Sequence, residues 1–124
     1  MVIFDSSILI DVLRGRKEAL EIIESYFGEE RIAITVLGKY EILRGAESSE
    51  AQFASDLLRQ FCVLDFNDSA VAEMVKAYKK LVRKGKMVNE LDLLVVGIAS
   101  ANNETLVTKD RDFLNFESKR IRVV

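Results

Sequence analysis

Four acidic side chains stand beside short apolar segments rather than in polar tracts. They are Asp5, Glu41, Asp92 and Asp110. Carboxylates near an apolar core cost free energy unless a cation offsets their charge, because two like charges about 4 Å apart repel by about 4 kcal/mol at an effective dielectric constant of about 20. If the fold brings the four together, a divalent cation is the simplest counter-charge, and such oxygen ligands suit Mg²⁺ or Mn²⁺. The sequence therefore predicts a carboxylate-lined metal site.

The elements that must position these acids alternate between strands and helices. Short β-branched runs predict strands at residues 1–4, 31–34, 62–64, 105–108 and 121–124. Apolar residues at helical spacing predict helices at residues 7–13, 17–27, 36–44, 49–61, 68–84 and 90–102. Their expected N-caps are Thr35, Asn67 or Asp68, and Asn89. This alternation predicts one domain over residues 1–124, an α/β fold with a three-layer α/β/α sandwich around a parallel sheet of about five short strands.

That architecture gives each acid a place. In open parallel sheets, ligands bind beyond the carboxyl ends of the strands, and Asp5 and Asp110 come just after the first and fourth predicted strands. Asp92 lies in the first turn of its helix, where the helix dipole favours negative charge. Glu41 lies two turns into the helix that follows the second strand. We expect the four to meet at one edge of the sheet.

Composition excludes several classes of protein. The chain has 124 residues, a net charge of −2, no histidine and one cysteine, Cys62. These counts exclude imidazole catalysis, histidine metal sites and an internal disulfide. No apolar stretch approaches the length of about 18 residues that a membrane helix needs, and Asp5 and Asp11 interrupt the first apolar segment, which differs from a signal peptide. We therefore expect a cytoplasmic protein with no membrane partner.

Four segments together resemble a known family. VIFDSSILIDVLRG, TVLGKYEILRGA, GKMVNELDLLVVGIAS and LVTKDRDF occur in this order from end to end of the chain. The sequence resembles PIN-domain nucleases, and specifically the toxin subunit of VapBC-type toxin–antitoxin pairs. The resemblance implies hydrolysis of RNA phosphodiester bonds with Mg²⁺ or Mn²⁺, a cognate antitoxin partner and a homodimer. It implies that catalysis and metal binding rest on Asp5, Glu41, Asp92 and Asp110.

The resemblance also implies supporting residues around these acids. Ser7 and Thr108 correspond to hydroxyl residues that would orient the carboxylates through hydrogen bonds. The segment TKDRDF offers two candidates for the last acid. We prefer Asp110, which is nearer the strand end, and expect Asp112 to be a supporting or surface residue. The aromatic residues proposed to contact the antitoxin, which core burial would explain equally well, are Tyr26, Phe27, Tyr40 and Phe53.

A run of cations without acidic residues precedes Asp92. It contains Lys76, Lys79, Lys80, Arg83, Lys84 and Lys86. One interpretation is a solvated face with cations placed favourably at a helix C-terminus. The other is a ridge that guides RNA phosphates toward Asp92. In the second interpretation the RNA-binding residues are Lys79, Lys80, Arg83, Lys84 and Lys86, with Arg14 and Arg16 on the other side.

Structural interpretations of the acids stay open. Asp5 could be only a helix N-cap, Asp92 only a dipole-stabilising residue, Asp110 only a turn residue, and Glu41 could pair with Arg44 or Lys39 on a surface. Two other functions also remain. One is a catalytically inactive interaction module with a PIN-like fold. The other is a phosphatase of the haloacid dehalogenase type, whose chemistry needs a second Asp at the position that Ser7 occupies.

Overall fold

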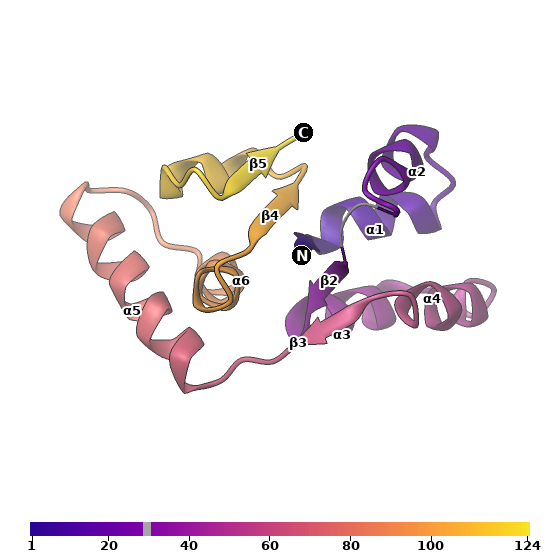
Figure 1. Cartoon of the computed structure of the whole chain (residues 1–124), viewed down its shortest axis with the longest axis horizontal. Helices are drawn as coiled ribbons and strands as arrows, with labels where there is room; N and C mark the ends of the chain where they lie inside the picture. The colour runs from indigo at the N-terminus through magenta and orange to yellow at the C-terminus, as the bar shows by residue number, and fades with distance from the viewer. Residues whose placement is uncertain (29–30) are drawn as a thin grey trace.

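The chain forms a parallel five-stranded sheet with the order β3-β2-β1-β4-β5. A computed structural model describes residues 1–28 and 31–124. The strands are β1 (Val2–Phe4), β2 (Ile32–Thr35), β3 (Cys62–Leu64), β4 (Thr105–Thr108) and β5 (Ile121–Val123), shown in Figure 1. Their number, order along the chain and direction confirm the sequence prediction, and no strand bound differs from the predicted one by more than one residue.

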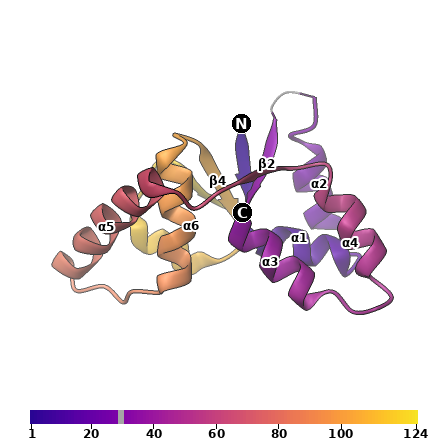
Figure 2. The same cartoon turned by 90° about the horizontal axis from the view of Figure 1, so that it is seen from below.

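Helices cover both faces of this sheet, as predicted. The helices of one side are α1 (Ser6–Leu13), α2 (Lys17–Glu24), α3 (Val36–Gly45) and α4 (Ala51–Leu58). Those of the other side are α5 (Asp68–Arg83), α6 (Glu90–Ala101) and the 3₁₀ helix η1 (Arg111–Phe116). Both cartoon views separate α5 and α6 from α1–α4 (Figures 1 and 2). The result is the three-layer α/β/α sandwich.

Side chains of the strands pack in two separate hydrophobic cores, one on each face of the sheet. Val2 and Phe4 of β1 pack in the core under α1–α4, whereas Ile3 between them packs in the core under α5 and α6. This alternation follows from the two-residue period of a strand. All three residues are at most 1% exposed, which explains why a central parallel strand is a continuous apolar run in sequence.

Polar caps start the helices that carry the acids. Thr35 Oγ1 accepts a hydrogen bond from the Gly38 N–H at 3.0 Å, and Asn89 Oδ1 accepts from two N–H groups in the first turn of α6. Both predicted caps are thus confirmed. Of the two candidates for α5, Asn67 is the cap, because its Oδ1 accepts from the Ala70 N–H at 3.0 Å.

Some predicted helix features are wrong. The helix expected at residues 17–27 ends at Glu24, the one expected at 49–61 spans only Ala51–Leu58, and η1 was not expected. The apolar spacing of the longest helix places Val71, Val75, Tyr78 and Val82 on one side, and the structure leaves this side between 42% and 51% exposed. α5 instead packs against α6 through small residues such as Ala70, whose carbonyl oxygen lies close to Gly97.

The order of the strands creates one switch point. The chain runs from β1 outward through β2 to β3, crosses the other face through α5 and α6, and returns beside β1 as β4. Neighbouring connections therefore leave β1 and β4 toward opposite faces, and the crevice beyond their carboxyl ends is where such sheets bind ligands. None of the described helices is both long and apolar enough to span a bilayer.

Candidate active site

Asp5 lies directly after β1, and its carboxylate is held by two hydroxyl groups. Ser7 Oγ and Thr108 Oγ1 each donate a hydrogen bond to Asp5 Oδ2 at 2.8 Å. Asp5 occupies the N-cap position of α1, yet its side chain makes no capping hydrogen bond. The interpretation of Asp5 as only a helix cap is therefore wrong. Both hydroxyls donate to the same oxygen, so the orientation of the Asp5 carboxylate is fixed.

Asp92 lies in the first turn of α6, where its own N–H donates to the Asn89 cap at 3.1 Å. The pKa of its carboxyl is raised from 3.8 to about 6. Burial is the largest cause, and the negative charges of Asp110, Asp5, Asp112 and Glu41 add to it in that order. The raised pKa shows that burial and repulsion outweigh the favourable helix dipole. Acids from three other segments, those of Asp5, of Glu41 and of Asp110 with Asp112, thus act on Asp92.

Glu41 projects from α3 toward the start of α1. Ser6 Oγ donates to Glu41 Oε1 at 3.2 Å. Burial raises the pKa of Glu41 and the charge of Asp5 raises it further, whereas the Ser6 hydrogen bond and the charge of Arg44 lower it. The Arg44 guanidinium lies 5.1 Å from the centre of the Tyr40 ring. Glu41 thus belongs to the acidic group more than to a surface ion pair.

Asp110 caps η1 and is tied to Asp5 through Thr108. The Asp110 N–H donates to Thr108 Oγ1 at 3.0 Å, and Asp110 Oδ1 accepts from the Asp112 N–H at 2.9 Å. Thr108 is fully buried and bridges the two acids, since its hydroxyl also donates to Asp5. Asp110 raises the pKa of Asp92 more than Asp112 does, and it is half-buried where Asp112 is exposed. These facts favour Asp110 over Asp112 as the fourth acid.

The acids converge without forming a closed cage. Within residues 1–28 and 31–124, no three acidic or cysteine side chains form a group that could hold a metal ion as they stand. Burial is the largest cause of the raised pKa values of Glu41 and Asp92, and the charges of neighbouring acids raise both further. Mg²⁺ usually takes only one or two carboxylates and keeps several waters, so this open set of oxygen donors fits a hydrated hard cation better than a dehydrated or soft one.

A family model described as PIN domain matches residues 2–119. The chain belongs to the PIN domain family. A curated relative, Ribonuclease VapC1 of Methanocaldococcus jannaschii, is 25% identical over 111 residues, which cover 89% of this chain and 76% of the relative.

Solved structures show the same fold over the whole chain. A toxin–antitoxin complex from Klebsiella pneumoniae matches with a TM-score of 0.83 at 21% identity, covering 98% of this chain and 95% of that one. VapBC from Salmonella typhimurium, bound to DNA, matches with a TM-score of 0.80 at 22% identity, covering 100% and 98%. At these identities the likeness establishes the PIN fold.

Two contacts of this PIN domain were not expected from the sequence. Ser6, beside the predicted Ser7, holds Glu41. Asp11 of α1 is 9% exposed and pairs with Arg16 at 3.2 Å and with Lys109, whose own N–H donates to Ser7 Oγ. Asp11 therefore anchors the segment between Thr108 and Asp110. The run DSS hinted at Ser6, but nothing in the sequence marked Asp11 as buried.

The cations of the PIN domain lie on different surfaces. Lys79 and Arg83 line a shallow outer surface of α5 with Tyr78 and Val82. Lys80 and Lys84 line a pocket between α5, α6 and η1. The basic run is therefore divided between two faces of the helix. On the opposite side of the sheet, Arg14 is exposed and Arg16 is held by Asp11. Their contact with RNA stays a prediction.

Proposed function

We propose that this chain is a divalent-metal-dependent endoribonuclease and the toxin component of a toxin–antitoxin pair. The observation that carries the proposal is the meeting of acids from separate segments: Thr108 links Asp5 to Asp110, and the charges of Asp5, Glu41 and Asp110 all contribute to the raised pKa of Asp92. The relatives support it, since one is named a ribonuclease and others are toxin–antitoxin complexes. Membership of the PIN family argues against the phosphatase alternative, which also lacks its second Asp at Ser7.

In this proposal Asp5 and Asp92 hold Mg²⁺ or Mn²⁺, and Asp110 completes the acidic set. A bound divalent ion would supply positive charge against the anionic phosphodiester and lower the pKa of a water molecule. Ser7 and Thr108 keep Asp5 in one orientation through their hydrogen bonds. Glu41 is suited to accept a proton from the attacking water, because its raised pKa makes it a stronger base than an exposed Glu.

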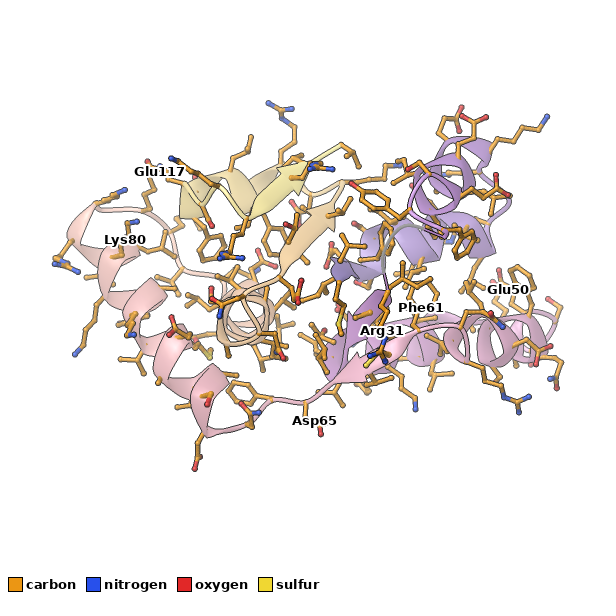
Figure 3. The ribbon with its side chains drawn as sticks, in the orientation of Figure 1. Arg31, Glu50, Phe61, Asp65, Lys80 and Glu117 are labelled. Carbon is orange, nitrogen blue, oxygen red and sulfur yellow. The ribbon has the colours of Figure 1, made fainter. Side chains whose placement is uncertain are left out.

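Cleavage of single-stranded RNA by the purified chain tests the nuclease directly. We expect cleavage with Mg²⁺ or Mn²⁺, none with EDTA, and a loss of at least about 100-fold in Asp92→Asn. Asp65→Asn is the matched control, because Asp65 also follows a parallel strand but is exposed at the outer edge of the sheet (Figure 3). Cleavage that survives EDTA or Asp92→Asn would reject this site. If no RNA is cleaved at all, the inactive interaction module gains support.

The antitoxin would need an apolar surface, and α2–α4 offer one. Phe27, Tyr40 and Phe53, three of the four aromatic residues suggested from the sequence, are at least 50% exposed. Tyr26 is different, because it packs edge-on against Phe4 with ring centres 5.4 Å apart. We therefore propose Phe27, Tyr40 and Phe53 as antitoxin contacts and assign Tyr26 to the core. The homodimer stays a prediction, for which the exposed apolar side of α5 is a suitable surface.

A further inference from the structure

A pocket of about 220 Å³ lies between α5, α6 and η1, apart from the carboxylates of the proposed active site. Lys76, Lys80 and Lys84 line it at intervals of four residues along α5, so they share one face of that helix. Ser100 of α6 and Asn115 of η1 add polar groups to its wall. Figure 3 shows Lys80 on the side of α5 that looks toward η1 and Glu117. We call this cavity the lysine pocket.

The charges of the lysine pocket leave one cation without a partner. Lys76 pairs with Glu73 at 3.2 Å. Lys84 pairs with Glu117, which also pairs with Lys86 at 3.2 Å. In the part of the chain that the structure describes, Lys80 has no ion-pair partner. Cations therefore outnumber anions around the lysine pocket, and an anion placed there would meet Lys80 first.

The lysine pocket adjoins the acidic site. A second pocket, of about 190 Å³, is lined by Asp92 and Asp112, and it shares Leu81, Asn115 and Phe116 with the lysine pocket. One continuous surface thus runs from the carboxylates to the lysines. A nucleic acid that presents one phosphate to the carboxylates and their metal can place a neighbouring phosphate along this surface, where the lysines would attract it.

We propose that the lysine pocket binds a backbone phosphate of the RNA substrate, with Lys80 as its main cation. Lys79 and Arg83 then lie off the RNA path, because they line the outer surface of α5 with Tyr78 and Val82. This inference rests on the proposed ribonuclease function. It places the path of the RNA between the carboxylates and Lys80. Recognition of a phosphate by Lys80 carries no sequence information, so this contact positions the RNA without selecting its bases.

Equilibrium binding in EDTA separates the two faces of α5 without requiring catalysis. The probe is fluorescein-labelled oligouridylate of about 12 nucleotides, a length within the usual range of single-strand sites. We expect Lys80→Glu to weaken binding at least about fivefold and to reduce the slope of log K against log salt by about 0.7, the contribution of one phosphate contact. Lys79→Glu is the matched control, with the same change one residue away, and we expect less than about a twofold effect.

Two results of these binding measurements would contradict a phosphate site at Lys80. If Lys79→Glu weakens oligouridylate binding as much as Lys80→Glu does, the effect is one of general charge. If Lys80→Glu binds the oligouridylate as tightly as wild type does, no phosphate binds at Lys80. Both lysines are exposed, and thermal melts of the two variants check that each is folded. If wild type cleaves RNA while Lys80→Glu binds normally, this inference fails alone. If wild type cleaves no RNA but the variants still differ, the nuclease proposal fails and the phosphate pocket stands.

A second variant changes binding in the opposite direction. Glu117→Gln removes the carboxylate that holds Lys84 and Lys86 and keeps the side-chain size. If the lysine pocket binds phosphate, the two released lysines should tighten oligouridylate binding at least about threefold and steepen its salt dependence. Glu21→Gln on α2 is the control for net charge, because Glu21 is also exposed but lies on the other side of the sheet. Equal tightening by both variants would contradict the proposal.

Discussion

At Asp92 the helix dipole favours the charged carboxyl, whereas burial and neighbouring acids oppose it. Its place in the first turn of α6 is favourable by about 0.3–1 kcal/mol when the carboxyl is charged. Burial and four neighbouring acids oppose that charge, and together they raise its pKa from 3.8 to about 6. The local rule that acids suit helix N-termini is therefore outweighed by the site. A residue kept at such a cost in stability is typical of functional positions.

The raised pKa predicts how the stability of the metal-free protein depends on pH. A carboxyl with a higher pKa in the folded state stabilises the fold below its unfolded pKa, and this contribution is lost as pH rises through the folded value. In EDTA we expect wild type to lose stability relative to Asp92→Asn between about pH 4 and about pH 7. The difference is on the order of 1 kcal/mol once solvent screening of the half-exposed carboxyl is allowed for.

Thermal melts of both proteins across this pH range measure the difference. Subtracting one curve from the other removes acids that titrate similarly in both, such as those far from the site. Asp65→Asn, which alters an exposed acid that does not act on Asp92, should follow wild type at every pH. An Asp92→Asn curve that runs parallel to wild type, or that falls below it near pH 7, would mean that Asp92 is not a strained acid.

At the scale of elements, the crossing of α5 and α6 depends on the absence of one side chain. A Cβ built on Gly97 would lie 2.7 Å from the Ala70 carbonyl oxygen and 3.0 Å from the Met74 Cβ. Both contacts are too close, and one involves backbone that cannot rotate away. α6 presents Asp92 and α5 lines the lysine pocket, so their separation also sets the geometry of the proposed RNA path.

Gly97→Ala should therefore destabilise the protein, although alanine is the better helix former. Higher helix propensity would contribute about 1 kcal/mol of stability, whereas forcing an extra carbon into a packed contact costs about 1–3 kcal/mol. We expect a net loss of about 1 kcal/mol, measured by urea unfolding. Ala72→Gly, at an exposed position inside α5, is a reference for helix propensity. A Gly97→Ala protein more stable than wild type would show that α5 moves away without cost.

The sequence predicts features of the helices that depend on neighbouring residues, but not those that depend on packing against distant parts of the chain. Local chemistry predicts the Thr35 and Asn89 caps, because a cap needs only its own first turn. It fails for α5, where the apolar side at Val75 and Tyr78 is exposed and the contact with α6 uses small residues instead. Helical periodicity identifies a face without saying what covers it. The buried Asp11 was missed for the same reason, since its partner Lys109 is 98 residues away.

For the acids too, local sequence predicts less than the arrangement of the strands does. Asp5, Asp65 and Asp110 all follow predicted strands, and nothing local separates them. Only the strand order does so, because β1 and β4 are neighbours at the switch point and β3 is an outer edge. Asp65 is exposed there and is absent from the charges that act on Asp92. Position after a strand therefore does not by itself distinguish Asp5 and Asp110 from Asp65.

At the scale of the whole molecule, the proposed site joins the two ends of the chain. Thr108 Oγ1 donates to Asp5 across 103 residues, and β4 pairs with β1 along its length. Glu41 and Asp92 come from helices on opposite faces of the sheet. The acidic cluster exists only when all three layers are assembled. An ion that binds the cluster should therefore bind the folded state and have no comparable site in the unfolded chain.

Divalent metal should for this reason raise the melting temperature of the protein. At a free Mg²⁺ concentration about ten times the dissociation constant, linkage gives about 1.4 kcal/mol, which is about 5 °C for a domain of this size. Differential scanning calorimetry across a Mg²⁺ titration, repeated with Mn²⁺, measures the shift. Because salt alone screens repulsion among the acids, NaCl at matched ionic strength must be subtracted. We expect Asp5→Asn to abolish the remaining increase in melting temperature and Asp65→Asn to retain it. An equal increase in NaCl and MgCl₂ would show that the salts only screen repulsion among the acids and that no ion is bound.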